Sequence, residues 1–154
     1  MKGRLLGVDY GEVRVGLAVS DPDRVLASPL ATYTRRDPKT DAAYFRQAVK
    51  AEDVVGLVVG LPLHTDGREG VKAKEAREYG AWLGTVTGLP VEFADERFTT
   101  VFAESALWNA GLTHKKRKER RDRVAAQMML QAHLDELAAA RSGGGAEREE
   151  PPHD

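Results

Sequence analysis

Residues 5–19 read LLGVDYGEVRVGLAV, and this stretch decides the fold. An apolar run ends at Asp9, and a short turn that contains glycine follows it. From Val13 to Val19, apolar side chains then alternate with other residues, which is typical of a strand. Two such runs joined by a short turn predict a β-hairpin at the start of the chain.

The rest of the chain predicts a third strand and then helices alternating with strands. Three hairpin-linked strands followed by strands joined through helices predict an α/β fold with a mixed five-stranded sheet, antiparallel in its first half and parallel in its second, flanked by helices. The further strands are expected at residues 26–33, 54–59 and 91–93, and the helices from Asp37-Pro38, over residues 71–83, from Thr99 or Thr100 to about Asn109, and from Arg121 or Asp122 to about Ala140.

Length and composition indicate one soluble domain. A chain of 154 residues leaves little room for a second domain. We expect the domain to span residues 1–141 and residues 142–154, SGGGAEREEPPHD, to form a disordered acidic tail. The absence of cysteine excludes thiol catalysis and cysteine-ligated zinc. No stretch has the ~20 apolar residues of a membrane span and none resembles a signal peptide, so we expect a cytoplasmic protein without a membrane partner.

Three acidic residues lie at the ends of predicted elements. Asp9 ends the first strand, Glu96 follows the strand at residues 91–93, and Asp122 lies at the start of the last predicted helix. Each has an ordinary structural explanation: a turn that binds backbone amides, a pair with an arginine, and a helix N-cap. Together they predict a different role, because Mg²⁺ and Mn²⁺ prefer oxygen ligands and two-metal phosphodiester cleavage needs several carboxylates.

Other catalytic patterns are missing from the sequence. The histidines lack zinc spacing, and neither G-x-S-x-G nor a phosphate-binding P-loop is present. The nucleophile is therefore expected to be water. Glycines at Gly7, Gly11 and Gly16 around the hairpin would let the backbone of a ligand come close to Asp9, although turn geometry is the alternative explanation.

A basic run precedes and surrounds Asp122. The whole chain has a net charge of -1, so only the local distribution favours a polyanion. The run is expected to form a loop that contacts phosphates, and the alternative is a solvated loop without a partner. Its cations are Lys115, Lys116, Arg117, Lys118, Arg120, Arg121 and Arg123.

Four blocks of sequence resemble the YqgF family of the RNase H-like superfamily. The resemblance covers about residues 4–138 and implies an RNase H-like fold, a divalent metal and a nucleic-acid substrate. Members are described as pre-16S rRNA nucleases and earlier as Holliday-junction resolvases. The resemblance places the family's acidic triad on Asp9, Glu96 and Asp122, in agreement with the three acids selected above. The blocks are GVDYGEVRVGLAVSD (residues 7–21), VVGLPLHTDG (58–67), DERFTT (95–100) and DRVAAQMMLQ (122–131).

The resemblance implies a hydrolase, a metal-dependent endonuclease that acts in 5′-end processing of pre-16S rRNA during ribosome biogenesis. Its catalytic and metal-binding residues would be the three acids, its cofactor Mg²⁺ or Mn²⁺, and its substrate RNA rather than branched DNA. Candidate nucleic-acid contacts are Arg14, Arg97, Lys115, Lys116 and Lys118.

Three alternatives stay open at this point. The first is a Holliday-junction resolvase, and the second is a non-catalytic RNA-binding factor for ribosome assembly. The third is an actin-like ATPase, which begins with a similar hairpin but needs two domains around its nucleotide, whereas this chain supplies one. The sequence does not indicate an oligomeric state.

Overall fold

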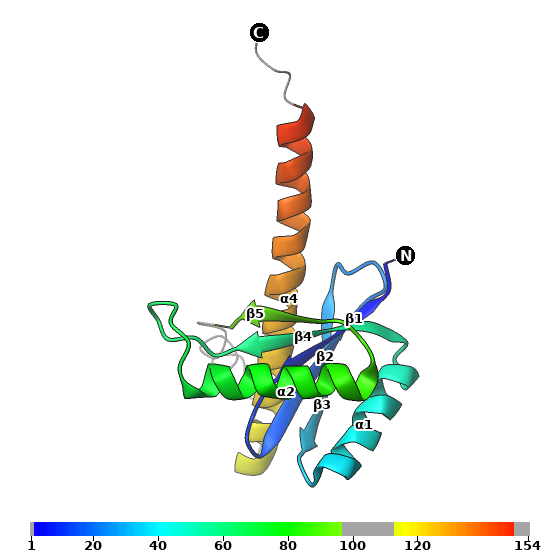
Figure 1. Ribbon diagram of the computed structural model, residues 1–154, viewed down its shortest axis with the longest axis vertical. Helices are drawn as coiled ribbons and strands as arrows, with labels where there is room; N and C mark the ends of the chain where they lie inside the picture. The colour runs from blue at the N-terminus through cyan, green and yellow to red at the C-terminus, as the bar shows by residue number, and fades with distance from the viewer. Residues whose placement is uncertain (1, 97–112, 150–154) are drawn as a thin grey trace.

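The computed structural model describes residues 2–96 and 113–149, with side chains described as far as Arg141. Five strands form one sheet and three helices cover it (Figure 1). The elements are β1 (Arg4–Asp9), β2 (Arg14–Ser20), β3 (Ala27–Thr34), α1 (Pro38–Ala51), β4 (Val54–Leu61), α2 (Val71–Thr87), β5 (Val91–Asp95) and α4 (His114–Glu149).

The sheet is mixed, as the sequence predicts. Its strand order is β3-β2-β1-β4-β5, so the first strand of the chain lies at the centre. β1 pairs antiparallel with β2 and parallel with β4, while β3 and β5 form the edges. The central position of β1 means that a residue at its end can be approached from both neighbouring strands. The predicted helix at residues 99–109 lies outside the described residues.

The helices form one layer on each face of the sheet (Figure 1). The side chains of β1 point alternately toward one helix layer and the other. Leu6 and Val8 are fully buried against α1 and α2, where they pack with Phe45. Leu5 faces the other way and packs in the cluster that contains Leu130 of α4. Successive strand residues point to opposite faces of the sheet. The residues at the end of β1 therefore face α4 or the layer of α1 and α2 in turn.

The last helix begins earlier than the sequence analysis predicts. α4 starts at His114, so the basic run forms helical turns and the prediction of a loop is wrong. Thr113 caps the helix, because its hydroxyl accepts from the N–H of Lys116 (3.3 Å) and its carbonyl accepts from the N–H of Arg117 (2.9 Å). Lysine and arginine are good helix formers, so repulsion between the cations does not prevent the helix.

The carboxyl end of α4 extends beyond the sheet (Figure 1). The backbone stays helical to Glu149, whereas the sequence analysis expected the helix to end near Ala140. Among the described side chains of α4, the fully buried ones end at Leu134. Within residues 2–96 and 113–149, no helix has both the length and the apolar surface required to cross a bilayer.

We expect a chain that ends at Arg141 to keep its melting temperature. Leu134 is the last buried side chain among the described residues of α4, so we expect the truncation to cost no core contact. Thermal unfolding followed by circular dichroism checks this expectation. A chain that ends at Gln131 is the control and should melt lower because it lacks Leu134. A lower melting temperature for the chain ending at Arg141 would contradict the proposed boundary at that residue.

Candidate active site

The first carboxylate of the candidate site, Asp9, ends the central strand. It lies opposite Gly16 of β2 and on the face of the sheet that α4 covers. Burial raises the pKa of Asp9; the hydrogen bond with Glu96 opposes that rise, and the negative charge of Asp122 adds to it. The ionised form of Asp9 is therefore disfavoured, because the carboxyl group is poorly solvated and has two acidic neighbours.

Glu96 reaches Asp9 across an intervening strand. It directly follows β5, and its backbone N–H donates to the carbonyl of Leu61 in β4 (3.2 Å). Its carboxylate lies over Gly60 of β4, where any Cβ would overlap Oε2 of Glu96. Glycine at this position opens a path over β4 from the edge strand to the centre of the sheet.

Burial and the charge of neighbouring carboxylates raise the pKa of both Asp9 and Glu96 and so favour a protonated pair. Burial raises the pKa of Glu96, as do the charge of Asp9 and the hydrogen bond in which the protonated Glu96 carboxyl donates to Asp9. Two carboxylates in contact cannot both ionise at low cost, so in the absence of a cation the pair keeps its proton. Bringing these two acids together matches the prediction from their positions in the sequence.

Asp122 comes from α4, which approaches the sheet closely at this point. A Cβ on Gly16 would overlap the backbone carbonyl of Asp122, so glycine in β2 sets how near the helix lies to Asp9. Asp122 lies in the third turn of α4, so the alternative interpretation of an N-cap is wrong. Its Oδ2 instead accepts from Nε of Arg14 at 2.8 Å, with both side chains partly exposed.

The structure therefore brings Asp9 and Glu96 into contact and places Asp122 beside them in an ion pair. Among the described residues, no three acidic or histidine side chains already form a group that could hold a metal ion. The donor set nevertheless fits a hard divalent cation, because it consists of carboxylate oxygens around a pair that needs positive charge. Asp122 is held by Arg14, so it must leave this ion pair before it can bind a cation.

Two neighbouring features bear on how a substrate could approach. Arg14, which the sequence predicts to contact nucleic acid, bonds Asp122 through its guanidinium in this structure, and its contact with phosphate stays a prediction. The expectation that Gly7 and Gly16 leave room for the backbone of a ligand is wrong, because α4 occupies that space: a Cβ on Gly7 would lie 3.0 Å from Cβ of Leu130. The contribution of Gly60 was missed, although a glycine inside an apolar strand is itself a sign of close approach.

The remaining nucleic-acid candidates lie at the amino end of α4, apart from Arg97, which falls outside the described residues. Lys115 and Lys116 are exposed and Lys118 is half-buried. The hydroxyl of Thr32 in β3 donates to the carbonyl of Glu119 and fixes this end of the helix to the sheet. The cations therefore occupy a fixed helical surface that precedes Asp122 by one to two turns.

The mixed five-stranded sheet with its flanking helices defines a protein with an RNase H-like fold. Two solved structures share the fold: the RuvC of Thermus thermophilus in complex with a Holliday junction substrate (TM-score 0.52, 13% identity, 86% of this chain and 96% of that chain), and the Fowlpox virus resolvase in complex with Holliday junction DNA (TM-score 0.55, 8% identity, 87% and 98%).

The chain belongs to the RuvX family, described as Holliday junction resolvase, whose sequence profile matches residues 3–136. This membership confirms the resemblance found in the four sequence blocks. A relative from Rhodopirellula baltica is 50% identical over 133 residues, covering 86% of this chain and 77% of its own length. One from Koribacter versatilis is 41% identical over 149 residues, covering 97% and 93%. Both carry the name "Putative pre-16S rRNA nuclease".

The raised pKa values give the metal-free protein a specific pH dependence. A carboxyl whose pKa is higher in the folded than in the unfolded state favours folding only while it is protonated. The contribution of Asp9 and Glu96 is therefore full below about pH 4 and is lost as pH rises through their raised pKa values. In EDTA at pH 8 we expect Asp9→Asn to melt above the parent, and near pH 4 the difference should vanish.

Thermal unfolding of both proteins at several pH values, with EDTA present, checks this expectation. Adding Mg²⁺ at pH 8 should raise the melting temperature of the parent and leave that of Asp9→Asn nearly unchanged. A parent that melts above the variant at pH 8 in EDTA would show that the carboxyl pair does not destabilise the metal-free fold.

Proposed function

We propose that this protein is a divalent-metal-dependent endonuclease that hydrolyses phosphodiester bonds in the 5′-end processing of pre-16S rRNA. The observation that carries the proposal is the contact between the buried carboxyl groups of Asp9 and Glu96 at the end of the central strand, with Asp122 beside them. Protein interiors rarely keep such a cluster of acids without a cation or a reacting group to balance it.

Asp9, Glu96 and Asp122 would hold Mg²⁺ or Mn²⁺. When bound, such an ion lowers the pKa of a water molecule and offsets negative charge on the phosphate. For the three acids to act together, Asp9 and Glu96 must both be ionised, and Asp122 must exchange Arg14 for the cation. The freed Arg14 guanidinium would then lie beside the site with its donors available to a phosphate oxygen.

The substrate assignment rests on the relatives. Their names mention pre-16S rRNA, which favours RNA, and an RNA processed during ribosome biogenesis would place the protein in the cytoplasm. The second candidate is resolution of branched DNA, favoured by the description of the RuvX family. Sequencing the 5′ ends of RNA products made by the purified protein with Mn²⁺ tests the first candidate: a discrete new 5′ end supports it, and unchanged RNA contradicts it.

The cationic surface of α4, defined as Lys115, Lys116 and Lys118, would hold the phosphate backbone. Like charges at the amino end of a helix oppose one another and the helix dipole, and a polyanion relieves both. The surface leads along the helix toward Asp122. It would therefore bring the backbone to the carboxylates.

Replacing all three lysines by Glu should weaken binding of RNA and flatten its salt dependence. Each lost contact to a single strand should reduce the logarithmic slope by about 0.7. Fluorescence anisotropy at several salt concentrations measures both quantities. The matched control replaces Lys39, Lys50 and Lys74, which are exposed on α1 and α2, and has the same change in net charge. Equal affinity and slope in the parent and the α4 variant would exclude this surface as the phosphate track.

A further inference from the structure

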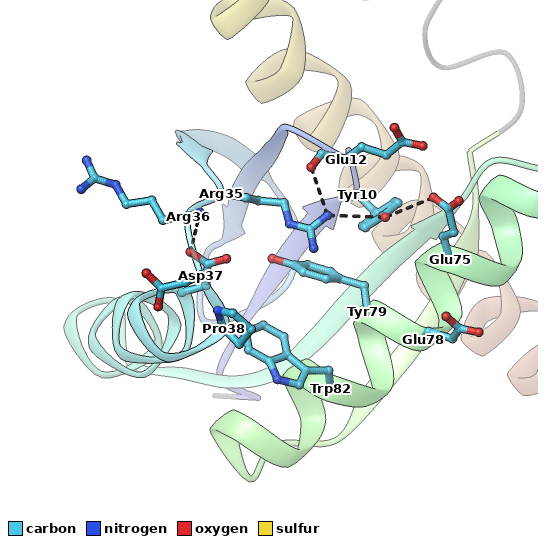
Figure 2. Close-up of a pocket in the computed structure, with 11 residues that line it drawn as sticks. Tyr10, Glu12, Arg35, Arg36, Asp37, Pro38, Glu75, Glu78, Tyr79 and Trp82 are labelled. Carbon is cyan, nitrogen blue, oxygen red and sulfur yellow. Dashed lines mark hydrogen bonds between the residues drawn. The ribbon is translucent and has the colours of Figure 1, made fainter.

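A hollow lies on the opposite face of the sheet from the carboxylates. It has a volume of about 440 Å³ and opens between the β1–β2 turn, residues 35–36 after β3, the start of α1 and the side of α2 that carries Tyr79 (Figure 2). Tyr10 lines it, whereas the preceding Asp9 lies on the face covered by α4, as alternation along a strand requires. The hollow is therefore separate from the candidate active site.

The hollow is lined by more negative than positive charge. Five carboxylates line it against two guanidinium groups, those of Arg35 and Arg36. Arg35 is already engaged: its guanidinium lies 4.9 Å from the centre of the Tyr79 ring and donates to the carbonyl of Gly11 (3.1 Å). Figure 2 shows the side chain of Arg36 directed away from the hollow. The carboxylates are those of Glu12, Asp37, Asp41, Glu75 and Glu78.

A buried hydroxyl in this hollow lacks a partner. Tyr79 is 7% exposed, and within residues 2–96 and 113–141 its hydroxyl has no hydrogen-bond partner. Buried hydroxyls almost always have one, so this oxygen indicates a group that the chain itself does not provide. Figure 2 shows the Tyr79 ring reaching from α2 toward the start of α1, with Arg35 beside it.

We propose that this hollow binds the guanidinium of an arginine side chain presented by a partner polypeptide. Its planar N–H groups would donate to the Tyr79 hydroxyl and to the second carboxylate oxygens of Asp41 and Glu75, and its face would lie against the ring of Trp82. The first oxygens are engaged: Oδ1 of Asp41 accepts from the Tyr33 hydroxyl (2.6 Å) and Oε2 of Glu75 from the Tyr10 hydroxyl (3.2 Å). Arginine fits better than lysine, because acceptors on two helices require donors that point in several directions. The excess of carboxylates excludes a nucleic-acid backbone as the occupant.

The proposal is independent of the nuclease activity. The two sites lie on opposite faces of the sheet, so a basic partner and a nucleic acid can occupy the protein together. Asp9→Asn, which removes one carboxylate of the candidate active site, should bind the partner peptide as the parent does. Failure of the arginine site and failure of the nuclease proposal are thus distinguishable.

The test uses the full chain and a short peptide of glycine around one arginine, with both ends blocked. Binding is followed by the indole N–H signal of Trp82 in ¹⁵N NMR spectra, identified with Trp82→Phe. The control peptide carries citrulline, which has nearly the same shape as arginine but no charge. Tyr79→Phe removes only the hydroxyl, and Glu75→Gln with Glu78→Gln removes two charges. Glu136→Gln with Asp135→Asn removes two charges from α4, at exposed positions away from the hollow.

The arginine peptide should move the Trp82 signal saturably, and the citrulline peptide should not. Tyr79→Phe should fold normally and weaken binding about fivefold, the loss expected for one hydrogen bond. The Glu75 and Glu78 double variant should weaken it further, and the α4 control should not. No saturable shift at millimolar arginine peptide would overturn the proposal and leave the hollow to water. Equal binding of citrulline, or equal binding by Tyr79→Phe and the parent, would overturn it as well.

Discussion

Asp9→Asn should reduce metal-dependent cleavage on the order of a thousandfold while the fold stays intact. A bound divalent ion contributes several kcal/mol of charge stabilisation, and each 1.4 kcal/mol changes a rate about tenfold. Asp9 has the central position in the site, in contact with Glu96 and within the electrostatic reach of Asp122, so its loss should remove the cation. Single-turnover cleavage at saturating metal measures the effect.

Glu96→Gln and Asp122→Asn should each give a loss of similar size. Asp23→Asn is the matched control, because Asp23 is exposed in the turn between β2 and β3 and should keep the activity of the parent. Circular dichroism and the melting temperature in EDTA verify that each variant is folded. Parent-level cleavage in any of the three variants would remove that residue from the site.

Gly16→Ala should destabilise the protein by about 3 kcal/mol, which corresponds to a fall of roughly 10 °C in melting temperature. The new methyl group would overlap the backbone carbonyl of Asp122, and a helix backbone cannot move aside without disturbing its packing. α4 packs on the sheet through buried side chains such as Met129 and Leu130, so a shift at Gly16 disturbs the whole interface.

Gly60→Ala, in contrast to Gly16→Ala, should leave the stability of the fold nearly unchanged and abolish most of the cleavage. Its methyl group would meet the end of the Glu96 side chain, which can rotate away, and would lie 3.3 Å from Cγ of Met129, which needs to shift only by a few tenths of an ångström. We therefore expect a melting temperature close to that of the parent together with a large loss of cleavage, because Glu96 no longer reaches Asp9. If Gly16→Ala melts like the parent, the helix does not lie as close to β2 as described. If Gly60→Ala cleaves like the parent, the path of Glu96 over β4 is not required.

The sequence predicts the parts of this fold that depend on local pattern. Alternation in residues 13–19 and the apolar runs at 5–9 and 54–59 predict the sheet, because one face or both faces of each strand are buried. The sequence does not predict the start of α4 correctly, because the dense positive charge of the basic run favours a loop. The capping hydroxyl of Thr113, which indicates a helix start, was not considered. Helix propensity and a single cap were enough to decide the structure there.

The features that no pattern revealed all depend on contacts between distant residues. Arg14 and Asp122 are 108 positions apart, and nothing in either segment indicates that they pair. The carboxylates themselves were identifiable because each ends an element, and the ends of adjacent strands meet. The hollow around Tyr79 could not be predicted, since its residues come from a turn, a strand end and two helices that only folding brings together.

The measurement that tests the central proposal most directly is cleavage by the pure protein titrated with Mn²⁺, with a 16S precursor fragment and a four-way DNA junction assayed in parallel. Asp9→Asn is assayed beside the parent on both substrates. We expect the parent to cut the RNA only when metal is present and in preference to the junction, and Asp9→Asn to cut neither. Preferential cutting of the junction would favour the resolvase candidate. Cleavage that persists in EDTA or in Asp9→Asn, or binding of the RNA without any cleavage, would contradict a metal-dependent nuclease built on these carboxylates.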